Sequence, residues 1–195
     1  MTLEEMKNLP EDKQKELFAQ LDLKRKLGKT INYGSVYGAG AATISRSAKV
    51  SQEKAQKMLD GYWALNHSVE KIAEEQYVIT CDKGLKWLVN PVNGFCYSLR
   101  GEKDRFSTLC QGTGSFFFEM WVDKILEKQQ KVFGKKKLTA CQHDDATFVF
   151  KNTDRNIEIV KKMLDEALQK VNEEFMLRRS LGCDTHVGFR YSEIH

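Results

Sequence analysis

Apolar residues at helical spacing dominate the first third of the chain. Residues 1 to about 24 carry a rough apolar stripe, and Pro10-Glu11-Asp12 is typical of a helix start, because carboxylates stabilise the first turn of a helix. A second helix is predicted from Lys24 to Tyr33, with glycines at positions 34, 38 and 40 interrupting the chain after it. Ser51 is a plausible cap for a third helix, whose apolar residues run from Ala55 to Trp63.

From Tyr77 onward the pattern changes to short aromatic and β-branched runs. Asn93-Gly94 is a strong hairpin signal between two of them. The predicted strands are 77–80, 85–89, 95–99, 138–141 and 146–150, with a last short strand near Val187. Long helices are predicted at 105–133 and 155–178. The sequence therefore predicts an α+β fold, with a helical first part followed by an antiparallel sheet backed by long helices.

Composition limits the class of protein without identifying it. The chain has 195 residues, of which 41% are hydrophobic and 30% charged, which is typical of a folded domain rather than a disordered one. The net charge of +4 permits a polyanionic partner but does not argue for one. No stretch of 18 apolar residues is present, so no membrane partner is expected.

The five cysteines are widely spaced and form no C-x-x-C pair, so a zinc site is not expected. The first 20 residues are too highly charged for a secretory signal. Reduced thiols in a cytoplasm are the simplest interpretation.

Arg25, Lys29, Tyr33 and Tyr37 follow one another at intervals of four residues. On a helix this spacing places the first three on one face. Two cations followed by an aromatic ring suit a triphosphate followed by a sugar and base, and glycines 28 and 34 would permit close approach to that face. The alternative is a solvated basic helix edge with two core tyrosines, since runs of charge usually mean solvation.

The whole string from Arg25 to Gly38 resembles motif B of the family A DNA polymerases, the DNA polymerase I family with its phage branch. The shared pattern is Arg, three residues, Lys, three residues, an aromatic-Gly pair, and later Tyr-Gly. The resemblance implies that Arg25 and Lys29 bind the phosphates of an incoming dNTP, with Lys29 also acting in catalysis. It further implies that Tyr33 packs beside the sugar and base, and that Tyr37 shapes the templating pocket.

Gln142-His143-Asp144-Asp145 lies between two strand-like runs. Adjacent carboxylates at a tight turn can converge on Mg²⁺, which binds one or two carboxylates together with substrate phosphates. A plain surface turn is the alternative. The string resembles motif C of the same family, usually His-Asp-Glu, which implies that Asp144 and Asp145 bind metal and that His143 approaches the primer end. Asp145 is one methylene shorter than the usual Glu.

Two further strings match the family in the expected order. Ser107-Thr-Leu-Cys-Gln111-Gly112 resembles its Asn-x-x-x-Gln-Gly stretch, which implies that Gln111 contacts primer-template DNA in the minor groove. The final eight residues resemble its terminal Gly-x-Asn-Trp-x-x-x-His, with Arg190 and Tyr191 departing from the pattern. They imply the polymerase's natural carboxyl end at His195.

Motif A, which carries the family's first catalytic aspartate, is not found upstream of motif B. The two-metal site of such an enzyme needs carboxylates from more than one segment. We therefore expect fingers-type helices in 1–76 and a partial palm in 77–195, with motif A and the thumb supplied by another polypeptide. A charged leader after Met1 suits one subunit of a split phage enzyme in a bacterial cytoplasm, and a piece cut from a longer polymerase is the alternative.

Two other functions are compatible with this sequence. A single-subunit RNA polymerase shares the Arg/Lys/Tyr-Gly helix and the His-Asp turn, although Tyr33 and Gln111-Gly112 favour DNA synthesis. A non-catalytic accessory protein derived from a polymerase would bind nucleic acid or scaffold a replisome without motif A. Retention of Arg25, Lys29, Tyr33 and Asp144 together argues against such decay.

Overall fold

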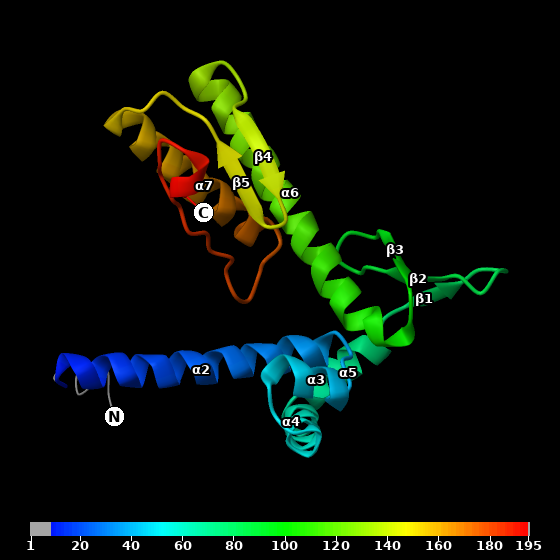
Figure 1. Cartoon of the computed structure of the whole chain (residues 1–195). Helices are drawn as coiled ribbons and strands as arrows, with labels where there is room; N and C mark the ends of the chain where they lie inside the picture. Colours follow the sequence, from blue (N-terminus) through cyan, green and yellow to red (C-terminus); the bar gives the residue numbers. More distant parts are fainter. Residues whose placement is uncertain (1–8, 195) are drawn as a thin grey trace. The chain divides into compact units, whose positions relative to one another are not determined.

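The computed structural model describes residues 9–194, and within them it has six α-helices and two small antiparallel sheets (Figure 1). The predicted α+β class is confirmed. The chain divides into two compact units, residues 1–110 and 111–195. The assignment of 1–76 to fingers and 77–195 to palm stays a prediction. No helix among the described residues is long and apolar enough to cross a membrane.

A single helix of 26 residues, α2 (Glu11–Val36), replaces the two helices predicted before position 34. Glycine costs a helix interior only about 1 kcal/mol relative to alanine, so Gly28 and Gly34 do not break it. The helix ends where Gly38 adopts a φ of +67°. The part of the predicted first helix that falls on residues 1–8 lies outside the described residues.

The core of the first unit lies where α2 meets α3 (Ala41–Ala48) and α4 (Gln52–Leu65). Ile44, Ala55 and Leu59 are buried there, with Ile31 of α2 packed against them. The predicted cap is confirmed, because the Ser51 side chain accepts a hydrogen bond from the backbone N–H of Lys54 at 3.2 Å. Helices α3 and α5 (His67–Glu74) were not predicted.

Gly34 is required by this packing. A Cβ at Gly34 would lie 2.2 Å from Cδ1 of the buried Ile44, whereas a Cβ at Gly28 on the same helix would have nothing within 4 Å. The sequence associated both glycines with close approach of a ligand. The contact with Ile44 gives Gly34 a packing role within the fold.

We expect Gly34→Ala to destabilise the chain and Gly28→Ala to stabilise it. Alanine at position 28 should add about 0.5–1 kcal/mol through helix propensity alone. At position 34, overpacking against Ile44 should lower the free energy of unfolding by about 1–3 kcal/mol, which exceeds the gain from helix propensity. Urea unfolding of both variants measures the difference, and equal stabilisation by the two alanines would contradict the packing role of Gly34.

The strands β1 (Val78–Thr80), β2 (Lys86–Val89) and β3 (Cys96–Leu99) lie where strands were predicted, and they form a meander in the order β1-β2-β3, separate from the sheet of the second unit. The hairpin signal at Asn93-Gly94 is confirmed, since Gly94 has a φ of +72° in the β2–β3 turn. The turn is longer than two residues. The buried Asn90 holds it by accepting the backbone N–H of Val92 at 2.9 Å.

A cluster of charged side chains joins this sheet to the start of α6. A short 3₁₀ turn (Glu102–Asp104) precedes α6 (Arg105–Phe133). Glu102 binds both Lys86 of β2 and Arg105 of α6. Arg105 also donates to the backbone carbonyl of Glu74 at the end of α5, at 3.5 Å.

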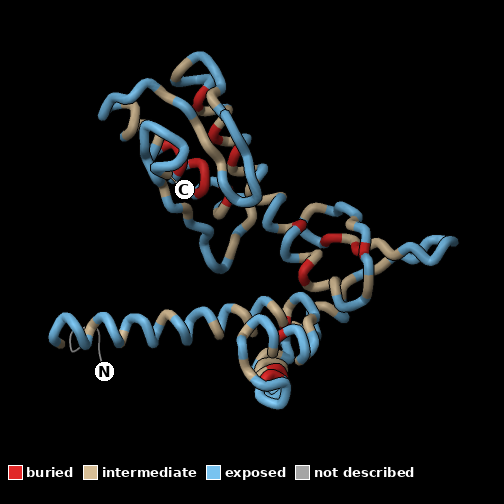
Figure 2. Tube along the Cα trace, viewed as in Figure 1, coloured by how far each residue is buried: buried red, intermediate tan, exposed pale blue. Residues whose placement is uncertain are grey.

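The second unit packs α6 and α7 (Asp154–Glu174) behind the hairpin of β4 (Leu138–Gln142) and β5 (Asp145–Phe148). Its buried core consists of Ile125, Met163, Leu164 and Ala167. Trp121 Nε1 of α6 donates to the carbonyl of Leu164 in α7 at 3.0 Å. Buried residues line the inner faces of these helices, whereas every residue of β4 is exposed (Figure 2).

Two elements of this unit, β5 and α7, are shorter than predicted. β5 runs from Asp145 to Phe148 instead of 146–150, and α7 ends at Glu174 instead of 178. The strand predicted near Val187 is wrong: residues 181–188 form no strand, and a 3₁₀ turn (Tyr191–Glu193) follows them. A strand needs a neighbour for its backbone groups, and β4 and β5 pair only with each other among the described strands.

Candidate functional site

The basic face of α2 is one continuous surface. Arg25, Lys29 and Tyr33 follow one another at intervals of four, and each step rotates only about 40° around the helix. Ile31 points to the core instead. Tyr33 is 51% exposed, so this face is available to a ligand and the alternative of a core tyrosine is wrong for it.

Each cation of this face is held by a contact within the helix. Arg25 donates from both Nε and Nη2 to Oδ1 of Asp22, at 3.3 and 3.1 Å. Lys26 binds the other carboxylate oxygen of Asp22 at 2.7 Å. The Lys29 ammonium lies over the Tyr33 ring, 5.6 Å from its centroid. Hydrogen bonds from Lys26 and then Arg25 lower the pKa of Asp22 below its ordinary value.

Tyr37 lies just beyond this face, at the C-cap of α2. Its backbone N–H donates to the carbonyl of Tyr33 at 2.9 Å, and its side chain is 45% exposed. The structure therefore holds all four residues of the predicted nucleotide-binding set along one helix and its cap.

The acidic pair lies at a two-residue turn. Gln142 of β4 pairs with Asp145 of β5, so His143 and Asp144 form the loop. His143 has a φ of +58°, in the left-handed region that favours glycine. A histidine there is held in a strained conformation, as is common at functional sites.

The hairpin also carries an irregularity in β4, four residues before the turn begins at His143. Leu138 pairs with Phe148 and Ala140 with Thr147, so Thr139 is an extra residue in β4. Such bulges bend a strand and re-aim its side chains, and they occur often beside active sites.

The turn directs its side chains to two different hollows. Asp144 and Asp145 line a cavity of about 700 Å³ on the β5 side, whereas His143 lines a hollow of about 410 Å³ against α6. Gln111 is exposed in the first half of α6 and lines neither hollow. The structure therefore places the two carboxylates at one cavity and His143 at another, and Gln111 lines neither of them.

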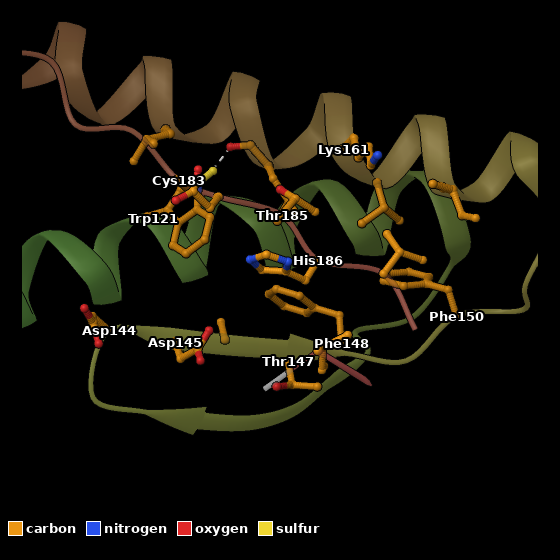
Figure 3. A pocket seen from close by; sticks show the side chains of 18 of the residues that line it. Trp121, Asp144, Asp145, Thr147, Phe148, Phe150, Lys161, Cys183, Thr185 and His186 are labelled. Atoms are coloured by element: carbon orange, nitrogen blue, oxygen red, sulfur yellow. Dashed lines mark hydrogen bonds between the residues drawn. The ribbon is translucent and has the colours of Figure 1, made fainter. Parts of the chain in front are cut away.

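The larger cavity has the form of a slot. β5 forms one side, the extended residues 181–188 form the other, and apolar side chains of α6 and α7 form its floor. Figure 3 shows Asp144 and Asp145 at one end of the hairpin and His186 projecting between α7 and β5. Aromatic rings make much of the lining: Phe117, Phe118, Trp121, Phe148 and Phe150.

The start of the 181–188 segment is anchored to α7. The backbone N–H of Leu181 donates to Asn172 of α7 at 2.7 Å, and Asn172 donates back to the Leu181 carbonyl at 3.1 Å. Just after the segment, the N–H of Phe189 donates to Glu193 at 2.7 Å, a contact within the C-terminal residues themselves. The paired hydrogen bonds to Asn172 therefore fix where the segment leaves α7.

The acidic turn fits one part of a magnesium site. Asp144 and Asp145 offer hard oxygen ligands, and Mg²⁺ binds one or two carboxylates with water and substrate phosphates. No group of three or more potential metal ligands exists among residues 9–194. The pair alone is therefore smaller than a complete two-metal centre.

Sequence reasoning missed three residues that shape these surfaces. Asp22 could have been found, because a carboxylate three residues before Arg25 lies within reach of it on a helix. Gly114 lines the slot and Ile44 packs on Gly34. Neither contact can be recognised from neighbouring residues in the sequence, because each brings together residues from different elements.

A comparison with protein-family models matches residues 11–193 to the family described as "DNA polymerase family A". Among individual proteins, DNA polymerase I of Caldicellulosiruptor bescii is 22% identical over 155 residues, covering 74% of this chain and 18% of that protein. The DNA-directed DNA polymerase of Enterobacteria phage T3 is 23% identical over 184 residues, covering 86% of this chain and 26% of the phage protein.

A shorter and stronger similarity exists to the DNA polymerase of Mycobacterium phage D29. It is 44% identical over 41 residues, which cover 21% of this chain and 7% of that protein. The chain thus spans about a quarter or less of the length of these relatives.

Proposed function

Because the chain belongs to DNA polymerase family A, with a match over residues 11–193, we propose that it is the catalytic C-terminal portion of a DNA-templated DNA polymerase. The polymerase adds a nucleotide when the primer 3′-hydroxyl attacks the α-phosphate of a dNTP and pyrophosphate leaves. The single observation that carries this proposal is the ordered set Arg25, Lys29 and Tyr33 on one exposed face of α2, within the region that matches the family. The phage relatives support a phage-type enzyme that acts in a bacterial cytoplasm.

The cations of α2 bind the triphosphate. Arg25 supplies a planar fork of donors for phosphate oxygens, and Lys29 supplies a mobile point charge. As negative charge moves to the leaving pyrophosphate, the ammonium of Lys29 stabilises it, which makes Lys29 a catalytic residue. Tyr33 packs beside the sugar and base, and Tyr37 shapes the pocket for the templating base.

Asp144 and Asp145 would hold the metal. Mg²⁺ bound there would lower the pKa of the attacking hydroxyl and neutralise phosphate charge. Asp144 in the turn would be the principal ligand, and Asp145 at the start of β5 would be the second. His143 on the opposite side of the turn approaches the primer end, while Gln111 contacts the minor groove of the primer-template DNA.

The remaining catalytic carboxylate is not among these 195 residues. An upstream polymerase fragment or subunit that carries motif A and the thumb completes the enzyme. The slot beside β5 supports this assignment, because it offers a strand edge, an apolar floor and an anchored segment opposite. We assign its occupant as an extended segment of that polypeptide, which adds to the β5 edge and brings its carboxylate to the end that holds Asp144.

The test is primer extension with Mg²⁺ and dNTPs, first with this chain alone and then with a co-expressed upstream fragment that carries motif A. We expect extension only with both polypeptides present. A stable pair that binds primer-template DNA without extending it would favour the non-catalytic accessory protein. Preference for rNTPs over dNTPs in the same assay would favour an RNA polymerase.

A further inference from the structure

Asp22 is the only carboxylate on α2 between positions 17 and 36, and both of its oxygens bind cations of the same helix. Arg25 directs two of its guanidinium donors, Nε and Nη2, to Oδ1 of Asp22. These are donors that would otherwise be available to a phosphate group. In this structure, therefore, the guanidinium of Arg25 is already engaged by an anion of its own chain.

The contact can be exchanged. The side chains of Arg25 and Asp22 are 70% and 43% exposed, so no packing holds them together. Exposed ion pairs of this kind stabilise a protein by about 1 kcal/mol or less, and a multiply charged phosphate is a stronger partner for a guanidinium fork than one carboxylate. Lys26 remains as a partner for Asp22 when Arg25 leaves, so the carboxylate is not left without a cation.

We propose that Asp22 is a positioning residue that occupies Arg25 until a polyphosphate ligand displaces it. The proposal rests on the assignment of Arg25 to triphosphate binding. Asp22 thereby weakens binding of every anion at this face, and ligands with several charged phosphate groups overcome the competition best, because they also engage Lys29. The Asp22 carboxylate therefore lowers the affinity of the site for singly charged anions more than its affinity for a triphosphate.

The test uses the full chain and inorganic tripolyphosphate, with binding followed by calorimetry and by the NMR resonance of the Arg25 Nε–H group. Asp22→Asn removes the competing charge and should tighten binding about two- to fivefold, the range expected for release of one exposed ion pair. Asp22→Glu keeps a carboxylate within reach of Arg25 and should bind as the unmodified chain does. Glu16→Gln removes the same charge from the same helix at a residue with no cationic partner among the described residues, and should have little effect.

The Arg25 resonance separates competition from a general change in helix stability. In the ligand-free Asp22→Asn variant, the Arg25 Nε–H resonance should already differ in chemical shift from that of the unmodified chain. The melting temperature of the variant should stay close to that of the unmodified chain. Equal affinity in Asp22→Asn and Glu16→Gln would overturn the role of Asp22. If instead Arg25→Ala binds tripolyphosphate as well as the unmodified chain, the assignment of Arg25 itself fails, and with it this part of the proposed function.

Discussion

Replacing Asp144 with alanine should lower nucleotide incorporation by the assembled polymerase about 10³-fold or more. Metal ions stabilise the charge of a phosphoryl-transfer transition state by several kcal/mol, and a loss of about 4 kcal/mol corresponds to a factor of about 10³. Asp144 is the carboxylate in the turn, and it lines the slot where we place the second polypeptide. Single-turnover primer extension with saturating dNTP measures the effect on the chemical step.

The matched control is Asp82→Ala. Asp82 is also an exposed aspartate between two antiparallel strands, at the β1–β2 turn of the other unit, but it has no assigned role. Its replacement should leave the rate close to that of the unmodified enzyme. If Asp144→Ala extended primers at the same rate as Asp82→Ala, Asp144 would not be a metal ligand, and the acidic turn would be an ordinary surface turn.

The elements that the sequence predicted well are those with strong local signals. Ser51 caps α4, and Asn93-Gly94 lies in the β2–β3 turn, because capping and positive φ depend on a few adjacent residues. The positions of Arg25, Lys29 and Tyr33 on one face follow from helix geometry once the helix is recognised. The basic face could therefore be predicted residue by residue.

The failures concern features that depend on distant residues. Gly34 resembles a helix breaker in the sequence, yet it continues α2 because its lack of a side chain admits Ile44 of α3. The run near Val187 has the composition of a strand, but no described strand pairs with it. A strand is defined by its neighbour, and composition alone does not supply one.

The slot itself had no signature in the sequence, because its walls come from segments about 40 residues apart. β5 and residues 181–188 face each other only after α6 and α7 have packed through Ile125, Met163 and Ala167. A partial palm that lacks motif A is expected to expose an apolar surface when it is isolated. An apolar slot beside an unpaired strand edge is consistent with that expectation, and it identifies which surface to test.

Gly114→Leu should weaken assembly with the upstream fragment without weakening the fold. A Cβ at Gly114 meets no atom within 4 Å, and the residue lines the slot, so a leucine side chain would enter the space assigned to the incoming segment. Overpacking of this kind costs about 1–3 kcal/mol, equal to about a 5- to 150-fold loss in association constant. The same change should stabilise α6 by up to about 1 kcal/mol, because leucine is the better helix former.

Gly61→Leu provides the control, because Gly61 lies within α4 of the other unit and a Cβ there also meets nothing within 4 Å. Both variants should unfold at slightly higher urea concentration than the unmodified chain, and only Gly114→Leu should bind the upstream fragment more weakly in a titration. Equal affinity for the fragment in the two variants would mean that the slot is not where the second polypeptide binds. Neither change removes a charged or metal-binding group. If only Gly114→Leu weakened assembly, a loss of primer extension in that variant would come from a sheet that lacks its added strand and not from a damaged active site.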